Sequence, residues 1–422
     1  MHRGVPSDFK PPRAWRVLTF AGIDDTPPAG DVAARAENAL NSPVRSSPLQ
    51  DRVSASSTVT ILIEDLTRAS PKAQVLGAVL AVLNAAGVQR DNIAVVIALG
   101  THRGLTTAEL ERAFGRDLVS TYRFMNHDCH AADLVPAGRL PTGQSVRIHP
   151  SAHEADVTMG IGSIFPHPMN GFGGGGKILF PGVADFDSIL AHHFTYTFQS
   201  GTGLGKIEAN PFYESVCDMA RSAGLDFIVN SILDRRDNLF DVVAGDPVHA
   251  HLAGIKISKS ILSQPFHKKA DLTLTTSFPY TEGPQIVKAL APASMVTKEG
   301  GCIILSAECD GTLPEPFVES FERFHRRHGA DLMTGVLHHF NEGRLIMDGG
   351  AIDYNMALGM TLAIMHRFKV ILVSEDIPRE TGTRMGFIYA GDLKEAFDLA
   401  GRYCSWPDVH IIPAGGVTLP MI

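Results

Sequence analysis

The side chains best suited to chemistry in this sequence are a lysine and several histidines that lie close together along the chain. A glycine-rich run at residues 171–177 reads GFGGGGK and ends in Lys177. Glycine at this density costs backbone entropy on folding, so we expect some group to approach the main chain closely there. The run therefore predicts a loop that binds a phosphate-bearing cofactor near the lysine amine. The glycines expected to contact that cofactor are Gly173, Gly174, Gly175 and Gly176.

The same run partly matches a nucleotide-binding P-loop. Its first seven positions fit the pattern G-x-x-x-x-G-K, but Ile178 stands where the pattern requires Ser or Thr. The preceding residues 165–168 contain two prolines, which are unfavourable inside a buried strand. A phosphate- or nucleotide-binding phosphotransferase is therefore the alternative, and a cofactor held close to Lys177 is the preferred interpretation.

Acidic, basic and histidine side chains follow two predicted strands in the first half of the chain. Asp65 and Arg68 lie just after the apolar segment 59–63, and His102 follows the apolar segment 93–99. Arginine can bind a carboxylate or phosphate through two parallel hydrogen bonds, and histidine exchanges a proton near neutral pH. Taken alone, each of these residues is also a common surface or structural group.

Further candidates flank the glycine run and recur in the second half. His167 precedes the run, and His192 and His193 follow it. Neutral imidazole is a common metal ligand, although no cysteine or H-E-x-x-H pattern nearby supports a zinc hydrolase. Gln285 and Lys288 are spaced i and i+3 on a predicted helix, so they share a face that suits a small hydroxy or keto acid.

Strands and helices alternate along the chain, which indicates an α/β protein with largely parallel sheets. We expect two doubly wound, Rossmann-like domains, residues 1–266 and 267–422, because residues 264–269 are polar and precede a new strand. In such sheets ligands bind beyond the carboxyl ends of the strands. The predicted strands are 15–20, 59–63, 93–99, 272–276, 302–307, 370–374 and 409–413, and the predicted helices are 72–86, 106–114, 284–291, 354–366 and 393–404.

Composition excludes several other classes of protein. At 422 residues the chain exceeds the usual size of one core, and its net charge of −8 disfavours nucleic acid or an anionic membrane as a partner. No run approaches 18 apolar residues, so no membrane span is expected. Five cysteines without a C-x-x-C pair, and an N-terminus without the apolar core of a signal peptide, predict a reduced, cytoplasmic protein.

Taken together, these residues resemble the nickel-pincer lactate racemase family, from about residue 59 to the C-terminus. The stretches that carry the resemblance are DLTR at 65–68, GTHR at 100–103, Pro166-His167 with Gly175-Gly176-Lys177, Pro181-Gly182-Val183, His193, Gly245-Asp246-Pro247, and Gln285 with Lys288. The resemblance implies a two-domain α/β isomerase, a racemase or epimerase of 2-hydroxy acids, with its active site in an interdomain cleft.

The resemblance also implies a cofactor. It is the nickel-pincer nucleotide, a pyridinium-3-thioamide-5-thiocarboxylic acid mononucleotide that carries Ni(II). By this resemblance Lys177 would hold the cofactor covalently, and His193 would be the protein ligand of square-planar nickel. The glycine run would let the mononucleotide lie against the backbone. The implied partners are a small 2-hydroxy acid and the enzymes that synthesise the cofactor.

Roles in the reaction follow from the same resemblance. His102 and His167 would be acid–base residues on opposite faces of the substrate, acting in mirror fashion while hydride leaves C2 and returns to the other face. The residues implied in substrate binding are Asp65, Arg68, Gln285, Lys288 and Tyr354.

Two departures from the family pattern bear on the substrate. Ala69 follows Arg68 where the family often has proline, and Tyr354 stands where lactate-specific members tend to have tryptophan. The tyrosine hydroxyl leaves a larger or more polar acid than lactate as an alternative substrate. A non-catalytic organic-anion-binding protein that uses Arg68 and Lys288 is the remaining alternative.

Overall fold

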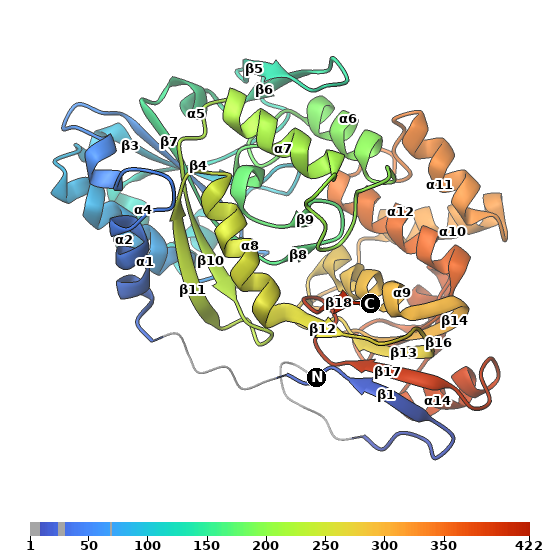
Figure 1. The fold of residues 1–422 in the computed structure, drawn as a ribbon. Coiled ribbons are helices and arrows are strands. Elements are labelled where there is room, and N and C mark those ends of the chain that lie inside the picture. The colour runs from blue at the N-terminus through green and yellow to red at the C-terminus, as the bar shows by residue number, and fades with distance from the viewer. Residues whose placement is uncertain (1–8, 24–29, 68–69) are drawn as a thin grey trace. The chain divides into compact units, whose positions relative to one another are not determined.

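The computed structural model describes residues 9–23, 30–67 and 70–422 (Figure 1). The chain forms two compact units, Thr26–Ile261 and Leu262–Ile422, and the second unit also includes the N-terminal segment that contains β1 (Arg16–Phe20). The expected boundary near residue 266 lies close to this division. The N-terminal segment, however, was expected with the first domain. It lies with the second because β1 pairs in parallel with β17 (Asp408–Ile412), a partner far along the chain that local sequence patterns do not reveal.

The N-terminal unit is built on a six-stranded sheet in the order β11-β10-β7-β2-β3-β4. All neighbouring strands are parallel except β10 and β11. The central strands are apolar over nearly their whole length, as expected for strands with both faces covered. The strands are β2 (Val59–Glu64), β3 (Ile93–Ala98), β4 (Arg123–Asn126), β7 (Val157–Ile164), β10 (Phe227–Leu233) and β11 (Leu239–Gly245).

Helices cover both faces of this sheet. On one face, α1 (Val32–Asn41), α2 (Lys72–Ala85) and α3 (Thr107–Phe114) pack against alternate residues of the strands in one apolar cluster. The other face carries the short 3-10 helix η3 (Gly175–Ile178) with α7 (Pro211–Ser222) and α8 (His249–Leu262). The Ile178 side chain fills the space beside Gly160 of β7, so the segment bearing Lys177 lies directly on the sheet.

The C-terminal unit is built on a second six-stranded sheet, in the order β1-β17-β13-β14-β15-β16, and every neighbouring pair is parallel. Its apolar cluster joins alternate strand residues to α14 (Leu393–Gly401) and to Trp15 of the N-terminal segment. Both units therefore confirm the expected α/β class with parallel strands. The other strands of this sheet are β13 (Ala270–Thr276), β14 (Thr297–Ser306), β15 (Lys369–Val373) and β16 (Ile388–Ala390).

One predicted helix takes a different form. Residues 284–291 begin as the 3-10 helix η4 (Gly283–Ala289), which continues into α9 (Leu290–Val296). Three residues make one turn of a 3-10 helix, so Gln285 and Lys288 share a face as expected, for a slightly different geometric reason.

The remaining elements are shorter or more peripheral. They are η1 (Leu49–Arg52), η2 (Arg90–Asn92), α4 (Arg116–Thr121), β5 (Val135–Arg139), β6 (Ser145–Ile148), α5 (Pro150–Glu154), β8 (Pro166–His167), β9 (Gly171–Phe172), α6 (Phe186–Tyr196), β12 (Ser263–Pro265), α10 (Glu315–His328), α11 (Leu332–Asn341), α12 (Ile352–Arg367), α13 (Arg379–Arg384) and β18 (Leu419–Met421). Among the residues described, no helix is both long and apolar enough to cross a bilayer.

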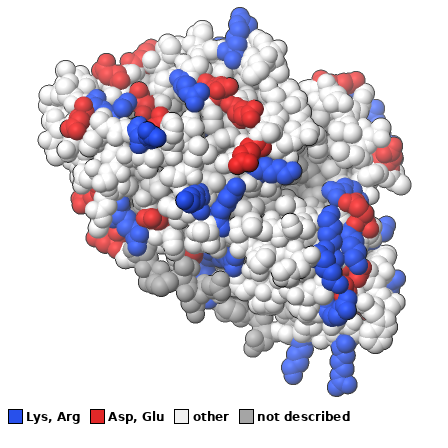
Figure 2. Space-filling model, in the orientation of Figure 1, with Lys and Arg blue, Asp and Glu red and all other residues white. Residues whose placement is uncertain are grey.

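Basic and acidic side chains are neighbours on much of the face shown in Figure 2. In the C-terminal unit, for example, Arg384 bridges Glu315 and Glu322.

Candidate active site

Three of the predicted site residues follow strands of the N-terminal sheet, at the side where the carboxyl ends of the parallel strands lie. Asp65 comes directly after β2, His102 follows β3, and His167 follows β7. Because β2 lies between β3 and β7 and all three are parallel, the ends of β3 and β7 are two strand spacings apart, about 10 Å. His102 contacts Asp65, and His167 follows a strand that ends on the same side of the sheet, the side where open parallel sheets bind ligands.

His102 is paired with Asp65. Its Nδ1 contacts Oδ2 of the carboxylate, and the other carboxylate oxygen accepts hydrogen bonds from the backbone amide of Thr67, at 3.0 Å, and from its hydroxyl. The Asp65 side chain is 9% exposed and that of His102 is 26% exposed, so the pair lies just below the surface. A carboxylate held in this way orients the imidazole and stabilises its protonated form. Asp65 therefore acts on His102, a role that we did not predict.

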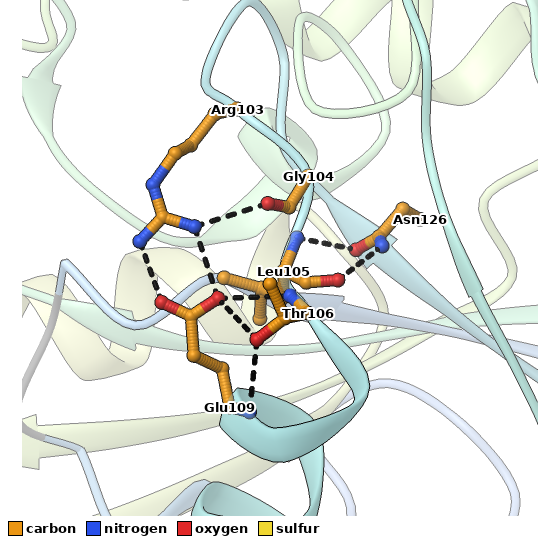
Figure 3. A network of polar contacts seen from close by, with 6 residues as sticks. All are labelled: Arg103, Gly104, Leu105, Thr106, Glu109 and Asn126. Atoms are coloured by element: carbon orange, nitrogen blue, oxygen red, sulfur yellow. Dashed lines mark hydrogen bonds and ion pairs between the residues drawn. The ribbon is translucent and has the colours of Figure 1, made fainter.

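The loop after β3 is fixed at its other end by a second network (Figure 3). Arg103 donates to both carboxylate oxygens of Glu109, at 3.0 and 2.6 Å, and Glu109 also accepts from the amide and hydroxyl of Thr106 in a capping box at the start of α3. Asn126 exchanges two hydrogen bonds with the backbone of Leu105, at 3.1 and 2.8 Å. These hydrogen bonds lower the pKa of Glu109 to about 2, and the bond from Arg103 makes the largest contribution. The network anchors the loop that presents the histidine.

His167 is held by backbone amides instead of a carboxylate. It lies at the end of β8, which pairs in antiparallel fashion with β9, and a tight turn joins the two. Within the turn, Nδ1 of His167 accepts hydrogen bonds from the amides of Met169, at 3.3 Å, and Asn170, at 3.1 Å. The two candidate acid–base residues are therefore oriented through the same ring nitrogen by opposite kinds of partner.

The glycine run packs tightly against protein side chains. A Cβ built on any of its four central glycines would come within 3 Å of another residue, so each glycine is required for packing. The atoms nearest those Cβ positions belong to Phe165 beside Gly173 (2.6 Å), Asn230 beside Gly174 (2.9 Å), His251 beside Gly175 (2.5 Å) and Ala220 beside Gly176 (2.8 Å). Contact between these glycines and a mononucleotide stays a prediction.

Two buried polar side chains hold the run in place. Asn230 of β10 accepts a hydrogen bond from the amide of Gly175 at 2.9 Å. His251 of α8 donates from Nε2 to the carbonyl of Gly173 at 2.7 Å, and its Nδ1 lies 3.4 Å from the hydroxyl of Tyr213. We did not predict a role for either residue. Asn230 gave the stronger signal, since it is polar within an otherwise apolar strand.

His193 has the tautomer and environment of a metal ligand. Its Nδ1 donates to the carbonyl of Ile189, one turn earlier in α6, at 2.9 Å, so the lone pair is on Nε2. Burial, followed by the charge of Lys177, lowers the pKa of His193 to about 3. The Phe212 ring lies 4.9 Å from the His193 ring and 5.8 Å from Nζ of Lys177. The predicted cofactor lysine and the predicted metal ligand thus lie close to the same aromatic ring.

The neighbouring His192 has a different environment. It is completely buried against the rings of Phe180, Tyr196 and Phe212. In the described part of the chain, neither of its ring nitrogens has a hydrogen-bond partner. Burial, followed by His193 and Lys177, holds its pKa well below the usual value. Adjacent residues of a helix point in different directions, so His192 packs in the core while His193 presents its Nε2 elsewhere.

A metal at this site would need ligands that the protein does not supply. Residues 9–23, 30–67 and 70–422 contain no group of three or more His, Cys, Asp or Glu side chains arranged to hold a metal ion. A metal bound by the Nε2 of His193 would therefore take most of its ligands from a cofactor. One neutral imidazole near a lysine amine is a donor set that fits a metal-bearing organic cofactor tethered at Lys177.

The loops that carry His102 and Lys177 are joined directly. The amide of Gly100 donates to the carbonyl of Gly182 at 2.8 Å, and Gly182 approaches the carbonyl of Ile178 too closely to allow a side chain. This contact explains the Pro-Gly stretch at residues 181–182 as a structural link between the acid–base loop and the lysine loop.

The remaining predicted site residues lie in the C-terminal unit, around η4. Gln285 is buried, and its Oε1 has no hydrogen-bond partner among the described residues. Nζ of Lys288 lies 4.8 Å from the centre of the Tyr280 ring, and the hydroxyl of Tyr354 lies 3.4 Å from a Cβ built on Gly283. A buried amide oxygen without a donor suits a ligand hydroxyl. We did not single out Tyr280 from the sequence, and Arg68 lies outside the described residues.

The structure does not support the P-loop alternative. Lys177 lies within a single 3-10 turn, η3, whereas a P-loop opens a longer helix whose amides point at the phosphates. In addition, β7 ends at Ile164, and the glycine run begins in the second strand of the β8–β9 hairpin instead of directly after β7. The nucleotide phosphotransferase interpretation therefore lacks the strand–loop–helix arrangement that it requires.

Comparisons with known proteins agree along nearly the whole chain. Family models described as the lactate racemase N-terminal domain and the lactate racemase C-terminal domain match residues 8–205 and 267–419. The lactate racemase of Thermoanaerobacterium thermosaccharolyticum is 30% identical over 386 residues, which cover 90% of this chain and 88% of that protein. The lactate racemase of Lactiplantibacillus plantarum is 30% identical over 421 residues, which cover 95% and 96%.

Solved structures give the same result. The structure of the lactate racemase apoprotein from T. thermosaccharolyticum superposes with a TM-score of 0.84 at 27% identity and covers 98% of this chain and 97% of that chain. A Thermotoga maritima protein of 17% identity shares the fold, with a TM-score of 0.67 and coverage of 92% and 98%.

Proposed function

The chain belongs to the lactate racemase family, and from that premise we propose that it inverts C2 of a small 2-hydroxy acid by reversible hydride transfer. Membership of the family makes the protein an isomerase. The proposal adds to this the type of reaction, the residues that carry it and the cofactor.

The observation that carries the proposal is the placement of the His102–Asp65 pair across β2 from His167. Hydride can leave C2 of a hydroxy acid only if the hydroxyl proton leaves the oxygen as well. An imidazole supported by a carboxylate is suited to take that proton, and a second imidazole on a nearby strand can contact the same oxygen. The strands that precede these groups end on one side of the sheet, and a hydrogen bond from Gly100 to Gly182 links the His102 loop to the segment after Lys177.

We assign the hydride acceptor to the nickel-pincer nucleotide, held covalently by Lys177 and through its nickel by Nε2 of His193. The low pKa of His193 keeps the ring neutral, as a metal ligand must be. When bound, this cofactor supplies the hydride chemistry, and the protein supplies position and charge. The network around Gly173 and Gly175 fixes the backbone from which the lysine extends.

The residues to which we assign substrate binding are charged or polar. Lys288, together with Arg68, neutralises the carboxylate, and the unpartnered Oε1 of Gln285 accepts a hydrogen bond from a hydroxyl. The Tyr354 hydroxyl favours an acid with a more polar tail than lactate. The protein partners that this proposal requires are the enzymes that make the cofactor.

Co-production with those cofactor-synthesis enzymes tests the proposal. Intact mass and nickel analysis should show one covalent group and one nickel per chain. Chiral analysis should then show inversion of at least one member of a panel of 2-hydroxy acids. A chain that stays unmodified in the presence of the synthesis enzymes would exclude the assigned cofactor, and a modified chain that inverts no acid would exclude the reaction.

A further inference from the structure

His102 and His167 differ in what Nδ1 contacts. At His102 this nitrogen faces a carboxylate oxygen of Asp65, which accepts hydrogen bonds, so Nδ1 must carry a proton. At His167 it faces the amides of Met169 and Asn170, which can only donate, so Nδ1 must be without a proton. A neutral imidazole has one N–H, and these contacts fix its position in each ring.

We propose that the two histidines rest in opposite tautomers, with the proton of His102 on Nδ1 and that of His167 on Nε2. They are then not interchangeable. His102 has its lone pair on Nε2 and is the proton acceptor, whereas His167 presents an N–H and is a hydrogen-bond donor to the substrate oxygen. The assignment of tautomers depends on the contacts alone, and the assignment of roles also rests on the proposed function.

The turn that holds His167 is itself fixed by side chains. Asn170 donates from Nδ2 to the carbonyl of Phe172 at 2.6 Å, and Asn210 donates from Nδ2 to the carbonyl of Met169 at 2.9 Å. Both asparagines are completely buried. The two amides are therefore held toward Nδ1. Rotating the ring by half a turn would place a carbon against both donors and leave these buried amides without an acceptor.

The contacts also decide which ring can carry a second proton. A second proton on His102 goes to Nε2 and keeps the contact between Nδ1–H and Asp65, whose charge stabilises the imidazolium. A second proton on His167 would go to Nδ1 and oppose the amides of Met169 and Asn170. His102 is thus the better carrier, and His167 keeps the single proton that it has.

The proton balance of the reaction follows. As C2 loses hydride, its hydroxyl proton passes to Nε2 of His102, and the C–O single bond becomes the carbonyl of a 2-keto acid. The N–H of His167 donates a hydrogen bond to that oxygen without releasing its proton. The keto acid then turns about its C2–O axis, so that the opposite face of C2 receives hydride while the oxygen stays within reach of His102, and the proton on His102 returns to that oxygen. No proton is gained or lost over the cycle, and the substrate alone changes configuration.

Nitrogen NMR of the protein without cofactor tests the tautomers directly. The chain is labelled with ¹⁵N-histidine, and ring signals are assigned by their absence in His102→Gln and His167→Gln variants. We expect the protonated nitrogen to be Nδ1 in His102 and Nε2 in His167. The same tautomer in both rings, or a protonated Nδ1 in His167, would overturn the proposal. This result does not depend on whether the proposed reaction occurs.

The same variants test the roles in cofactor-loaded enzyme. Glutamine offers an N–H near the position of Nε2 but cannot shuttle a proton. We expect His102→Gln to lose at least ~100-fold in kcat and His167→Gln to lose no more than ~10-fold. His167→Ala, which has no donor, should be slower than His167→Gln. Equal losses in the two glutamine variants, each with a wild-type melting temperature and full cofactor, would refute the donor role. A wild-type enzyme that inverts no acid would instead refute the proposed function.

Discussion

The lysine loop of the N-terminal unit and the η4 cluster of the C-terminal unit differ in how fully their polar groups are satisfied. Around the lysine loop, the amide of Gly175 and the carbonyl of Gly173 are bound by Asn230 and His251. Around η4, Oε1 of Gln285 is buried without a hydrogen-bond partner among the described residues.

From this difference we infer which of the two regions is built before its ligand arrives. A loop whose backbone is held from two sides has one conformation and can present a lysine reproducibly. A buried acceptor without a donor costs free energy unless something else supplies the donor. We therefore assign the lysine loop to a permanently held group and the η4 cluster to a ligand that comes and goes.

The largest effect should come from Lys177. Lys177→Arg keeps a positive charge beside Phe212 but removes the primary amine. We expect complete loss of the covalent cofactor, measured as intact mass after co-production with the synthesis enzymes. Lys259→Arg, which alters a lysine beside the Phe172 ring, is the matched control and should be modified normally. A covalent group that persists in Lys177→Arg would place the attachment elsewhere.

The second effect is a loss of stability in mild acid, centred on the N-terminal unit. Burial is the main cause that lowers the pKa of His193 to about 3 and those of His127 and His251 to about 4, from a usual value near 6.5. Between these values the unfolded chain binds protons that the folded chain does not. Stability should therefore fall as pH drops below 6.5, by about 1.4 kcal/mol per histidine for each pH unit until its folded pKa is reached.

Hydrogen exchange of the two units at pH 7 and pH 5 measures this effect. The peptides of β7, β10 and α8 should lose more protection at pH 5 than those of β13 and β14. His251→Gln keeps a donor for Gly173 but cannot be protonated, so it should make the stability of the N-terminal unit less dependent on pH. Earlier opening of the C-terminal unit would show that these three histidines do not control acid sensitivity.

Several elements could be predicted because their signals are local. The Thr106 and Glu109 capping pair marks the start of α3, and short, largely apolar segments mark β2 and β3. The proximity of Asp65 and His102 also followed from local information, because each comes after a predicted strand and parallel strands end on one side of a sheet. The strand that precedes His167, β7, was not predicted.

Other features depend on pairings between distant parts of the chain. The sheet position of β1 is set by β17, and the glycine run is held by His251 from 78 residues away. No residue type or spacing marks these contacts. Likewise, the glycines between Phe172 and Lys177 suggested contact with a ligand, whereas the structure shows that protein side chains occupy the space beside them.

The third effect concerns Gln285 in the η4 cluster, whose buried amide oxygen has no hydrogen-bond partner among the described residues. Gln285→Leu removes the unpartnered amide while keeping a similar volume. We expect a melting temperature equal to or above that of the wild type, because the buried acceptor is gone. The value of kcat/KM should fall by ~10- to 100-fold, because the substrate hydroxyl loses its acceptor.

Asn230→Leu is the matched variant at the lysine loop, where the backbone groups have hydrogen-bond partners. It leaves the amide of Gly175 without a hydrogen-bond acceptor, so it should lower the melting temperature and slow capture of the cofactor. If both variants destabilise the protein to a similar degree, the contrast between the two regions does not hold.

The smallest effect should be at Tyr354, where a single hydroxyl is at issue. Tyr354→Phe keeps the ring, whose centre lies 5.2 Å from that of Phe317, and removes only the hydroxyl beside Gly283. Stability should stay within about 0.5 kcal/mol of the wild type, as for most changes away from the core. If the hydroxyl contacts the substrate tail, kcat/KM should fall by a few-fold to ~10-fold for an acid with a hydroxylated tail and stay unchanged for lactate. Tyr354→Trp should shift the preference toward lactate. An unchanged ratio in both variants would mean that Tyr354 lies outside the substrate site, and the polar tail would then have to be recognised by other residues.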